Sequence, residues 1–331
     1  MYSKYLITGA AGFLGRAILE ELAHYPAEVT ALVLPDDPQR HTLPDYVHVV
    51  TGDIADAASL KDFFRGAGPD TCVLHCAGLI SIASRPGKRI YRVNVGGTRN
   101  ILEQCRQHHV GKLVYVSSVH AITEAPKGAV IQETTAFSPH TVDGAYAKSK
   151  AMATSLVLDA ARQGLNASVV QPSGIIGPGD SGQSNISGML LSYLHGKLPF
   201  AVRGGYDFVD VRDVASGILA CADKGRSGSC YILSGHYTTI RSLLCTVRQL
   251  TNGKPILAYL PLGLARAAAP LFEKISLRRR EPLYFTPYSV AVLGSNGHFS
   301  HQRASEELAY QPRSLADTLR DTLAWLGQAV S

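Results

Sequence analysis

The stretch Thr8-Gly9-Ala10-Ala11-Gly12-Phe13-Leu14-Gly15 decides the fold of this chain. It follows a short apolar run at residues 5–7, which predicts a strand, and it precedes apolar residues at helical spacing between residues 17 and 23. A helix that begins in a glycine turn presents its first backbone N–H groups to an anion. The stretch therefore predicts a phosphate-binding turn, and a tight turn without a ligand is the alternative.

The three glycines have different expected roles. Gly9 allows the tight turn, Gly12 lets the backbone approach a pyrophosphate, and Gly15 lets the helix pack closely on the strand. Their spacing is G-x-x-G-x-x-G, which differs from the G-x-G-x-x-G of the standard dinucleotide fingerprint. The interpretation therefore depends on the context that the rest of the chain provides.

Strands and helices alternate through the first half of the chain. Further strands are predicted at residues 29–34, 47–50, 72–75, 112–116 and 167–171, and helices at residues 18–22, 60–64, 93–108 and 145–163. Such alternation predicts right-handed βαβ units. The expected fold class is α/β, a doubly wound parallel sheet that binds a dinucleotide across the carboxyl ends of its strands.

The pattern changes after Pro172. Residues 173–185 are rich in Gly, Ser and Pro and predict an active-site loop. A strand at 208–211, a helix at 213–222 and a strand at 230–233 follow, and then helices interrupted by prolines. We predict a dinucleotide-binding domain of residues 1–172 and about 206–235, and a smaller, mostly helical substrate domain of residues 173–205 and 236–331.

Composition and charge are those of an ordinary globular protein. The 331 residues are 46% hydrophobic and 18% charged, and the net charge of +6 is spread out except at Arg278-Arg279-Arg280. No longer basic stripe or recognised motif is present, so we expect no nucleic-acid partner. The arginine triplet favours a solvated face, and contact with an anionic group or an acidic membrane surface is the alternative.

The cysteines and the apolar segments bear on location. The six cysteines show no C-x-x-C spacing, which favours reduced thiols in a cytoplasmic protein and neither disulfides nor a metal site. No secretory signal precedes the first strand. The apolar stretch 256–272 is interrupted by Pro261, Arg266 and Pro270 and is too short to span a membrane. We expect it to cover the substrate, and peripheral attachment remains open.

A serine, a tyrosine and a lysine carry the expected chemistry. Ser118 follows the predicted strand at 112–116, and Tyr146 and Lys150 lie four apart, on one face of a helix. A nearby cation favours the phenolate of a tyrosine, whose ordinary pKa is about 10, so Tyr146 is a candidate general acid–base. Ser118 can donate a hydrogen bond to the same substrate oxygen. A Tyr-x-x-x-Lys pair alone is common on solvated helices, whereas this conjunction is much more specific.

Over essentially its full length the chain resembles the extended short-chain dehydrogenases/reductases, and among them the dihydroflavonol reductases and 3β-hydroxysteroid dehydrogenases. The matching segments are residues 8–15, 52–54, 75–78, 94–98, 116–118, 146–150, 172–179 and 208–215. The resemblance implies a Rossmann fold, NAD(P)(H) as cofactor and hydride transfer as the reaction.

The resemblance also implies residue roles. Ser118, Tyr146 and Lys150 would be the catalytic set, with Lys150 also holding the nicotinamide ribose. The implied cofactor contacts are Gly9, Ala11, Gly12, Phe13, Leu14, Leu34, Asp36, Asp53, Ile54, Ala77, Gly78, Tyr146, Lys150, Pro172 and Ile175. Asp53 would contact the adenine, and a role as N-cap of the following helix is compatible with that.

Three polar residues have less specific expectations. We expect Asn94 to brace its helix and not to react. His75 ends a strand, where a hydrogen-bonded core histidine is usual, and the resemblance also places it on the cofactor side. His120 lies two residues after Ser118, so both can line the substrate pocket, and a solvated loop position for His120 is the alternative.

The end of the second predicted strand bears on cofactor choice. It reads Val33-Leu34-Pro35-Asp36-Asp37. An acidic residue at the strand end would pair with a ribose 2′-hydroxyl, and an arginine would accept a 2′-phosphate, but Leu34 stands there. Asp36 could turn back to the ribose, whereas Arg40 or His41 could hold a phosphate. On balance the segment favours NAD(H).

The segments around the expected site favour a bulky uncharged substrate. Residues 171–180 lack the Arg and Asn typical of nucleotide-sugar enzymes, and the stretches 189–194, 256–264 and 282–288 are apolar and aromatic, as a ligand pocket or a packed lid would be. We expect an oxidoreductase for a ketone, alcohol or aldehyde of a steroid or flavonoid type. The alternatives are a nucleotide-sugar epimerase or dehydratase that retains NAD, and a non-enzymatic dinucleotide sensor. A homodimer is compatible with the resemblance.

Overall fold

The computed structural model describes residues 1–84, 87–180, 184–279 and 283–330. Residues 181–183 of the predicted active-site loop, Arg280 of the arginine triplet and Pro282 of an apolar stretch lie outside the described residues.

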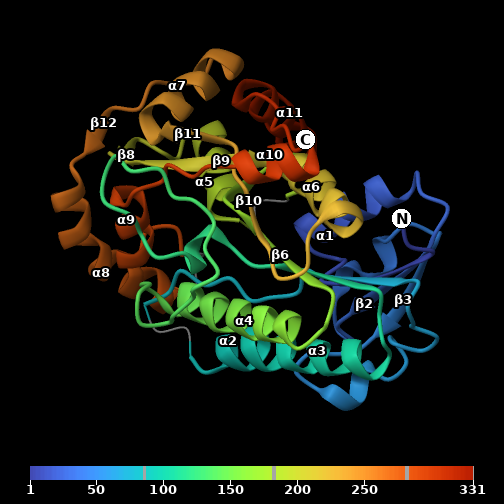
Figure 1. Ribbon diagram of the computed structural model, residues 1–331. Helices are drawn as coiled ribbons and strands as arrows, with labels where there is room; N and C mark the ends of the chain where they lie inside the picture. Colours follow the sequence, from blue (N-terminus) through green and yellow to red (C-terminus); the bar gives the residue numbers. More distant parts are fainter. Residues whose placement is uncertain (85–86, 181–183, 280–282, 331) are drawn as a thin grey trace.

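A parallel sheet of seven strands forms the centre of the molecule, in the order β10-β6-β5-β4-β1-β2-β3 (Figure 1). Its strands are β1 (Lys4–Thr8), β2 (Glu28–Val33), β3 (Val47–Thr51), β4 (Thr71–His75), β5 (Lys112–Val116), β6 (Ala167–Pro172) and β10 (Cys230–Leu233). The strand order reverses between β1 and β4. The carboxyl ends of these two strands therefore border the crevice in which doubly wound sheets bind ligands.

Helices cover both faces of this sheet (Figure 1). They are α1 (Phe13–Leu22) and α6 (Val211–Lys224) on one face, and α3 (Thr98–Gln107) and α4 (Ala145–Arg162) on the other. Successive residues of a strand point to opposite faces. Accordingly Ile7 packs in the core that contains Ile18 and Ile218, and Leu6 in the core that contains Ile101. Burial on both faces explains why these strands are nearly continuous apolar runs.

A second region lies over the carboxyl ends of the strands. It contains a three-stranded sheet, β11-β9-β7, and a two-stranded sheet, β12-β8. The strands are β7 (Gly174–Ile176), β8 (Phe200–Val202), β9 (Gly205–Asp210), β11 (His236–Thr239) and β12 (Ala258–Leu260). Its helices are α5 (Asn185–Leu194), α7 (Ile240–Thr251), α8 (Leu262–Arg279), α9 (Pro287–Gly294) and α11 (Leu315–Val330). Helix α10 (Gln302–Leu308) instead packs in the core of the large sheet, beside α6.

The predicted α/β fold class is confirmed, and the structure corrects three of its elements. The predicted helix at 60–64 is a 3₁₀ turn, η2 (Ala57–Leu60), because the glycines at 66 and 68 and Pro69 follow too closely for a longer helix. The strand predicted at 208–211 is β9, which pairs with β7 and β11 outside the large sheet. The domain division stays a prediction.

The third correction concerns the helix predicted at 93–108. It consists of the short α2 (Arg89–Tyr91), a π-helical turn, η3 (Arg92–Gly97), and α3. Inside the π turn the Asn94 side chain bonds to the backbone of Leu79, and a Cβ on Gly97 would lie 2.6 Å from Ile54 Cδ1. These contacts hold the widened turn close to its neighbours. π turns of this kind are frequent at functional sites.

The predicted apolar stretch at 256–272 forms β12 and the first part of α8. None of the helices among the described residues is long and apolar enough to cross a membrane.

Candidate active site

The glycine turn lies between β1 and α1, against the end of β4. Gly9 has a φ of +72°, and a Cβ there would lie 2.8 Å from the Ala77 nitrogen. A Cβ on Gly15 would lie 2.2 Å from the Gly9 carbonyl oxygen. Only glycine fits these two positions. Helix α1 begins after Gly12 without a side-chain cap, so the positive end of its dipole is open to an anion.

Buried hydrogen bonds join β1, β4 and α3 beneath this turn. The Thr8 hydroxyl lies 2.7 Å from His75 Nδ1 and accepts from the Ala77 N–H at 3.1 Å, and His75 Nε2 lies 3.1 Å from the Thr98 hydroxyl. Burial, with the nearby Lys150, lowers the pKa of His75 to about 3, so this imidazole is neutral. His75 is therefore the hydrogen-bonded core histidine that its strand position predicts, beneath the backbone of the Ala77 segment.

Ser118, Tyr146 and Lys150 meet where β5 ends beside the start of α4. The Ser118 hydroxyl caps the 3₁₀ turn η4 (Val119–Ala121) and accepts from the His120 N–H at 3.2 Å. Tyr146 is the second residue of α4, and Lys150 follows one turn later. Lys150 Nζ donates to the Val116 carbonyl at 2.7 Å and lies 5.0 Å from the centroid of the Tyr115 ring.

Burial dominates the protonation of this group. It raises the pKa of Tyr146 to about 12, although interaction with the Ser118 hydroxyl lowers it. Burial lowers the pKa of Lys150 to about 8, and the nearby Cys76 opposes that change. The sequence predicted a Tyr146 pKa lowered by the ammonium. The structure differs, because Lys150 is directed at Val116 and Tyr115 and the buried phenol loses its solvation. Tyr146 is neutral at pH 7.

Asn94 braces the wall beside Lys150. Its Oδ1 accepts from the Leu79 N–H at 2.7 Å, and its Nδ2 donates to the Leu79 carbonyl and to the Ser149 hydroxyl, both at 2.9 Å. A Cβ on Gly78 would lie 3.3 Å from both Asn94 Oδ1 and Lys150 Nζ. The backbone after β4 thus passes directly over the lysine, which matches the expected bracing role of Asn94.

The residues predicted at the cofactor ribose, Leu34 and Asp36, follow β2, and the predicted adenine contacts, Asp53 and Ile54, follow β3. Leu34 is 45% exposed and Asp36 is also exposed. Ile54 is buried, and its carbonyl accepts from Asn100 Nδ2 at 2.8 Å. Asp53 accepts from the Ala55 N–H at 2.9 Å, but the N-cap of the following η2 turn is Asp56. The capping role predicted for Asp53 is therefore wrong, because the turn begins three residues later.

Basic side chains hold the segment after β2. This segment ends in the 3₁₀ turn η1 (Pro38–Thr42), which Asp37 caps. Arg40 donates to the Pro35 carbonyl at 2.9 Å and to His41 Nε2 at 2.7 Å, and Arg16 of α1 donates to the Thr42 hydroxyl.

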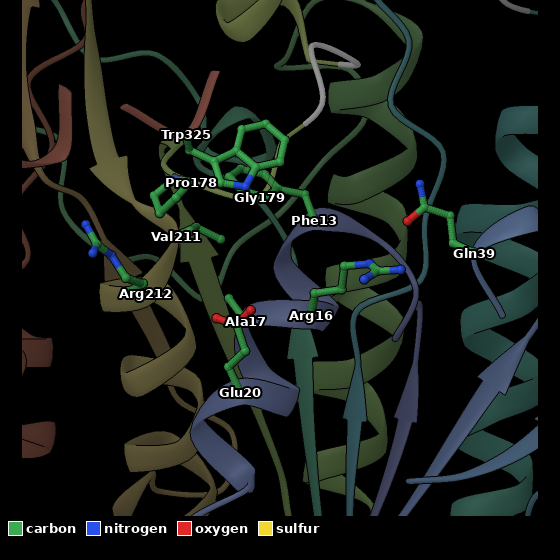
Figure 2. A pocket seen from close by; sticks show the side chains of 10 residues that line it. All are labelled: Phe13, Arg16, Ala17, Glu20, Gln39, Pro178, Gly179, Val211, Arg212 and Trp325. Atoms are coloured by element: carbon green, nitrogen blue, oxygen red, sulfur yellow. The ribbon is translucent and has the colours of Figure 1, made fainter. Parts of the chain in front are cut away.

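A pocket of about 340 Å³ lies beside the N-terminal turn of α1 (Figure 2). Its lining residues are Phe13, Arg16, Ala17, Glu20, Gln39, Pro178, Gly179, Val211, Arg212 and Trp325. Figure 2 shows Arg16 extended toward Gln39, whereas Arg212 points away from them. Arg212 instead pairs with Asp210 and Asp321, at 2.7 Å each.

Three aromatic side chains lie beside Tyr146, on the side where we predict the substrate pocket. His120 Nε2 lies 2.8 Å from the Tyr206 hydroxyl, and the two rings are nearly parallel at 13°. The His120 ring also lies 6.1 Å from that of Tyr146 and 6.0 Å from that of Tyr288. Burial lowers the pKa of His120 to about 4, so it is neutral. His120 is thus a partly buried member of this aromatic group in the turn η4, and the solvated loop position is wrong.

Sequence reasoning missed Tyr206 and Tyr288 as members of the site. The Tyr288 ring lies where a Cβ on Gly144 would be, 2.4 Å from its nearest atom, and its hydroxyl is buried without a hydrogen-bond partner among the described residues. Gly144 has a φ of +84° and precedes α4. The apolar stretch at 282–288 was the available signal for Tyr288, whereas nothing in the sequence distinguished Tyr206.

The remaining predicted cofactor contacts lie at the crevice or beside it. Phe13 and Leu14 open α1, Pro172 ends β6, and Ile175 lies in β7. A parallel sheet with a glycine turn after its first strand, and with Ser, Tyr and Lys gathered beyond its fifth, is the arrangement of the short-chain dehydrogenases/reductases.

Comparison with known proteins specifies the family. The chain belongs to the NAD dependent epimerase/dehydratase family, whose sequence pattern matches residues 5–233. It is 31% identical to sterol demethylase protein B of Methylococcus capsulatus, over 97% of each chain. It is 29% identical to a putative dihydroflavonol 4-reductase of Synechocystis, over 98% of this chain and 95% of that one.

Further comparisons agree with this placement. Sterol-4-alpha-carboxylate 3-dehydrogenase, decarboxylating, of Schizosaccharomyces pombe is 26% identical, over 98% of this chain and 97% of that one. The crystal structure of gox2253 superposes with a TM-score of 0.85 at 29% identity, over 98% of each chain. The protein is thus an enzyme of the NAD-dependent oxidoreductase and epimerase type.

Proposed function

We propose that this enzyme transfers a hydride between NAD(P)(H) and the ketone or alcohol carbon of a bulky, apolar, steroid-like substrate. The observation that carries the proposal is that the neutral phenol of Tyr146 lies beside a group of uncharged aromatic side chains, His120, Tyr206 and Tyr288. A nucleotide-sugar substrate would need cationic side chains for its diphosphate, and these three side chains provide none. An uncharged polycyclic substrate would instead gain from packing on the rings.

The crevice fits a dinucleotide on structural grounds. Gly9 and Gly15 leave no room for a side chain, and the uncapped start of α1 offers N–H groups to a pyrophosphate. We assign the adenine to Asp53 and Ile54 and the nicotinamide ribose to Lys150, with Ala77, Gly78, Pro172 and Ile175 along the wall. The nicotinamide, when bound, supplies or accepts the hydride.

The remaining chemistry belongs to the side chains. In the direction of reduction, Tyr146 donates its phenolic proton to the substrate oxygen as that oxygen gains charge. Its neutral state at pH 7 suits this direction. Ser118, which interacts with the Tyr146 phenol, provides a second hydrogen bond to the same oxygen. Lys150 is fixed by the Val116 carbonyl, so its charge is held at one place.

Two relatives support a steroid over a flavonoid. The names of the Methylococcus and Schizosaccharomyces proteins refer to sterols, and both proteins align over nearly the whole chain. In this proposal His120 and Tyr206 stack against the ring system, and the Tyr288 hydroxyl binds a polar substituent. The segment around Leu34 and Asp36 decides between NAD(H) and NADP(H), because it lies where the ribose 2′ position is expected. We propose that it prefers NAD(H).

The test is oxidation of NADH and of NADPH, followed by absorbance, with 3-oxosteroids, dihydroflavonols and small ketones as substrates. We expect net oxidation of NADH by a 3-oxosteroid, and its loss in Tyr146→Phe but not in Tyr237→Phe, which alters an exposed tyrosine of β11. Absence of net oxidation across the panel, together with dinucleotide retained through purification, would favour a nucleotide-sugar epimerase instead.

A further inference from the structure

Exposed apolar side chains concentrate on one edge of the molecule. Among the residues that the structure describes, Leu257 before β12 is 73% exposed, and on α8 Leu264 is 64% and Leu271 61% exposed. Phe272 and Leu277 of α8 are more than half exposed as well. Figure 1 shows β12 and α8 at the edge opposite β2 and β3. Scattered exposed leucines need no explanation, but several exposed apolar side chains on one helix and the segment before it are typical of an interaction site.

The exposed leucines occupy the outward side of α8. Its buried residues are Ala265, Ala269 and Glu273, which are spaced four apart and so face the protein. Leu264 and Leu271 are seven apart and lie on the other side of the helix. An ordinary surface helix has polar residues on that side. Helix α8 therefore presents apolar groups both to the protein and to its surroundings.

Two basic residues share the outward side with these leucines. Lys274 and Arg278 of α8 follow Leu271 by three and seven residues and are exposed. The acidic residue of α8, Glu273, is buried and accepts hydrogen bonds from the backbone and the hydroxyl of Ser84, both at 2.7 Å. No acidic residue therefore offsets these cations on the outward side of α8. Apolar and cationic groups on one helix face are the combination that binds an anionic lipid surface.

This surface adjoins the candidate active site. Helix α8 packs on α9 through Ala265, Ala269 and Val290, and α9 carries Tyr288. The Ser84 segment, which Glu273 holds, also carries Ile80, 74% exposed. The Thr286 hydroxyl donates to the Ile82 carbonyl at 2.8 Å, so the segment is fixed to both α8 and the start of α9. The apolar edge therefore belongs to the elements that cover the substrate side.

We propose that α8 and the residues before it dock the enzyme on an anionic membrane surface, with Leu257, Leu264 and Leu271 among the lipid head groups and Lys274 and Arg278 at the phosphates. The charge of the face decides this occupant over a second copy of the chain, since two copies would bring the same cations together. Such docking places the substrate side next to the phase in which an apolar substrate dissolves. The docking itself is measured without substrate and does not depend on the proposed reaction.

The experiment is co-sedimentation with vesicles of phosphatidylcholine containing phosphatidylglycerol, compared with vesicles of phosphatidylcholine alone. We expect the wild-type enzyme to partition at least about tenfold better onto the anionic vesicles, and the preference to fall as salt is added. Leu264→Asp/Leu271→Asp and Lys274→Glu/Arg278→Glu should each lose at least about tenfold in partitioning. Unchanged melting temperatures would show that these variants remain folded.

Matched controls test whether the loss of binding is specific to α8 or follows from removing any exposed cation or apolar side chain. Lys61→Glu/Lys224→Glu changes the net charge by the same amount at exposed positions elsewhere, and Val130→Asp removes another exposed apolar side chain. Both should partition like the wild type. Equal losses in these controls, or no wild-type binding to anionic vesicles, would overturn the proposal. So would α8 variants that only convert a dimer to a monomer, because the face would then join two copies.

Activity on the 3-oxosteroids of the substrate panel, measured without vesicles, distinguishes the two proposals. If vesicle binding fails while a 3-oxosteroid is reduced, docking is wrong and the proposed reaction stands. If vesicle binding holds and no ketone of the panel is reduced, docking stands and the proposed reaction is wrong.

Discussion

The ammonium of Lys150 donates a hydrogen bond to the carbonyl of Val116, 2.7 Å away, at the last residue of β5. This bond ties α4 to the end of β5, just before Ser118, and leaves the lysine beneath the backbone of Gly78. The helix that carries Tyr146 is thereby placed relative to the strand that leads to Ser118. We infer that Lys150 positions the site as well as supplying its charge.

Replacement of Tyr146 tests the assignment of the proton donor. We expect Tyr146→Phe to lower kcat by about 10²–10⁴-fold, because general acid catalysis is lost, while the dissociation constant for the dinucleotide stays nearly unchanged. Lys150→Ala should impair both quantities, because we assign Lys150 to the ribose. The measurements are steady-state kinetics and fluorescence titration with NADH. Lys148→Ala, on the same helix, is the control. Equal losses of cofactor affinity in Tyr146→Phe and Lys150→Ala would contradict the division of roles.

Lys150 should cost stability in the enzyme without cofactor. Its pKa of about 8, below the ordinary 10.5, means that the buried charge is disfavoured by about 3 kcal/mol. Between pH 8 and 10.5 the unfolded chain binds more protons at this residue, so its cost disappears as pH rises through that window. Lys150→Met should therefore unfold at a higher denaturant concentration than the wild type at pH 7. The difference should shrink at pH 10, and a variant less stable at pH 7 would show that the bond to Val116 outweighs burial.

His120 should make the protein sensitive to acid. Its pKa of about 4 lies below the ordinary 6.5, so between these values the unfolded chain binds a proton that the folded chain does not. Stability then falls as pH decreases through this window, by up to about 1.4 kcal/mol per pH unit. His120→Gln keeps a polar group near the Tyr206 hydroxyl but cannot titrate. From pH 7 to pH 4 the free energy of unfolding, measured with denaturant, should fall less steeply in this variant than in the wild type. Identical slopes would contradict a neutral imidazole held among these rings.

The sequence predicted those features that depend on the residue's own backbone conformation or on its immediate neighbours in the chain. Gly9 and Gly15 could be assigned because a side chain at either position would collide with backbone. The strands at 72–75 and 112–116 could be recognised because burial on both faces makes them nearly continuous apolar runs. Ser118 and Tyr146 could be placed together because Tyr146 lies at the start of the helix that follows the strand ending before Ser118.

Features set by distant contacts could not be predicted in this way. The protonation of Tyr146 depends on how completely other segments bury it, and the sequence indicated only the nearby lysine. Tyr206 reaches His120 because β9 leaves the large sheet to pair with β7 and β11. The π turn at Asn94 depends on its bonds to Leu79 and Ser149. Each of these relations joins segments far apart in the chain.

The Tyr288 hydroxyl should act in substrate binding and not in folding. It is buried without a hydrogen-bond partner among the described residues, so Tyr288→Phe removes no protein hydrogen bond and should leave the melting temperature unchanged or raise it. If this hydroxyl binds a polar substituent of the substrate, the variant should raise KM by about three- to tenfold with little change in kcat. Tyr206→Phe is the comparison, because it breaks the 2.8 Å contact with His120 and should reduce stability. A Tyr288→Phe enzyme with unchanged KM for every substrate would remove this hydroxyl from the pocket and leave only its ring, packed against Gly144, as a structural element.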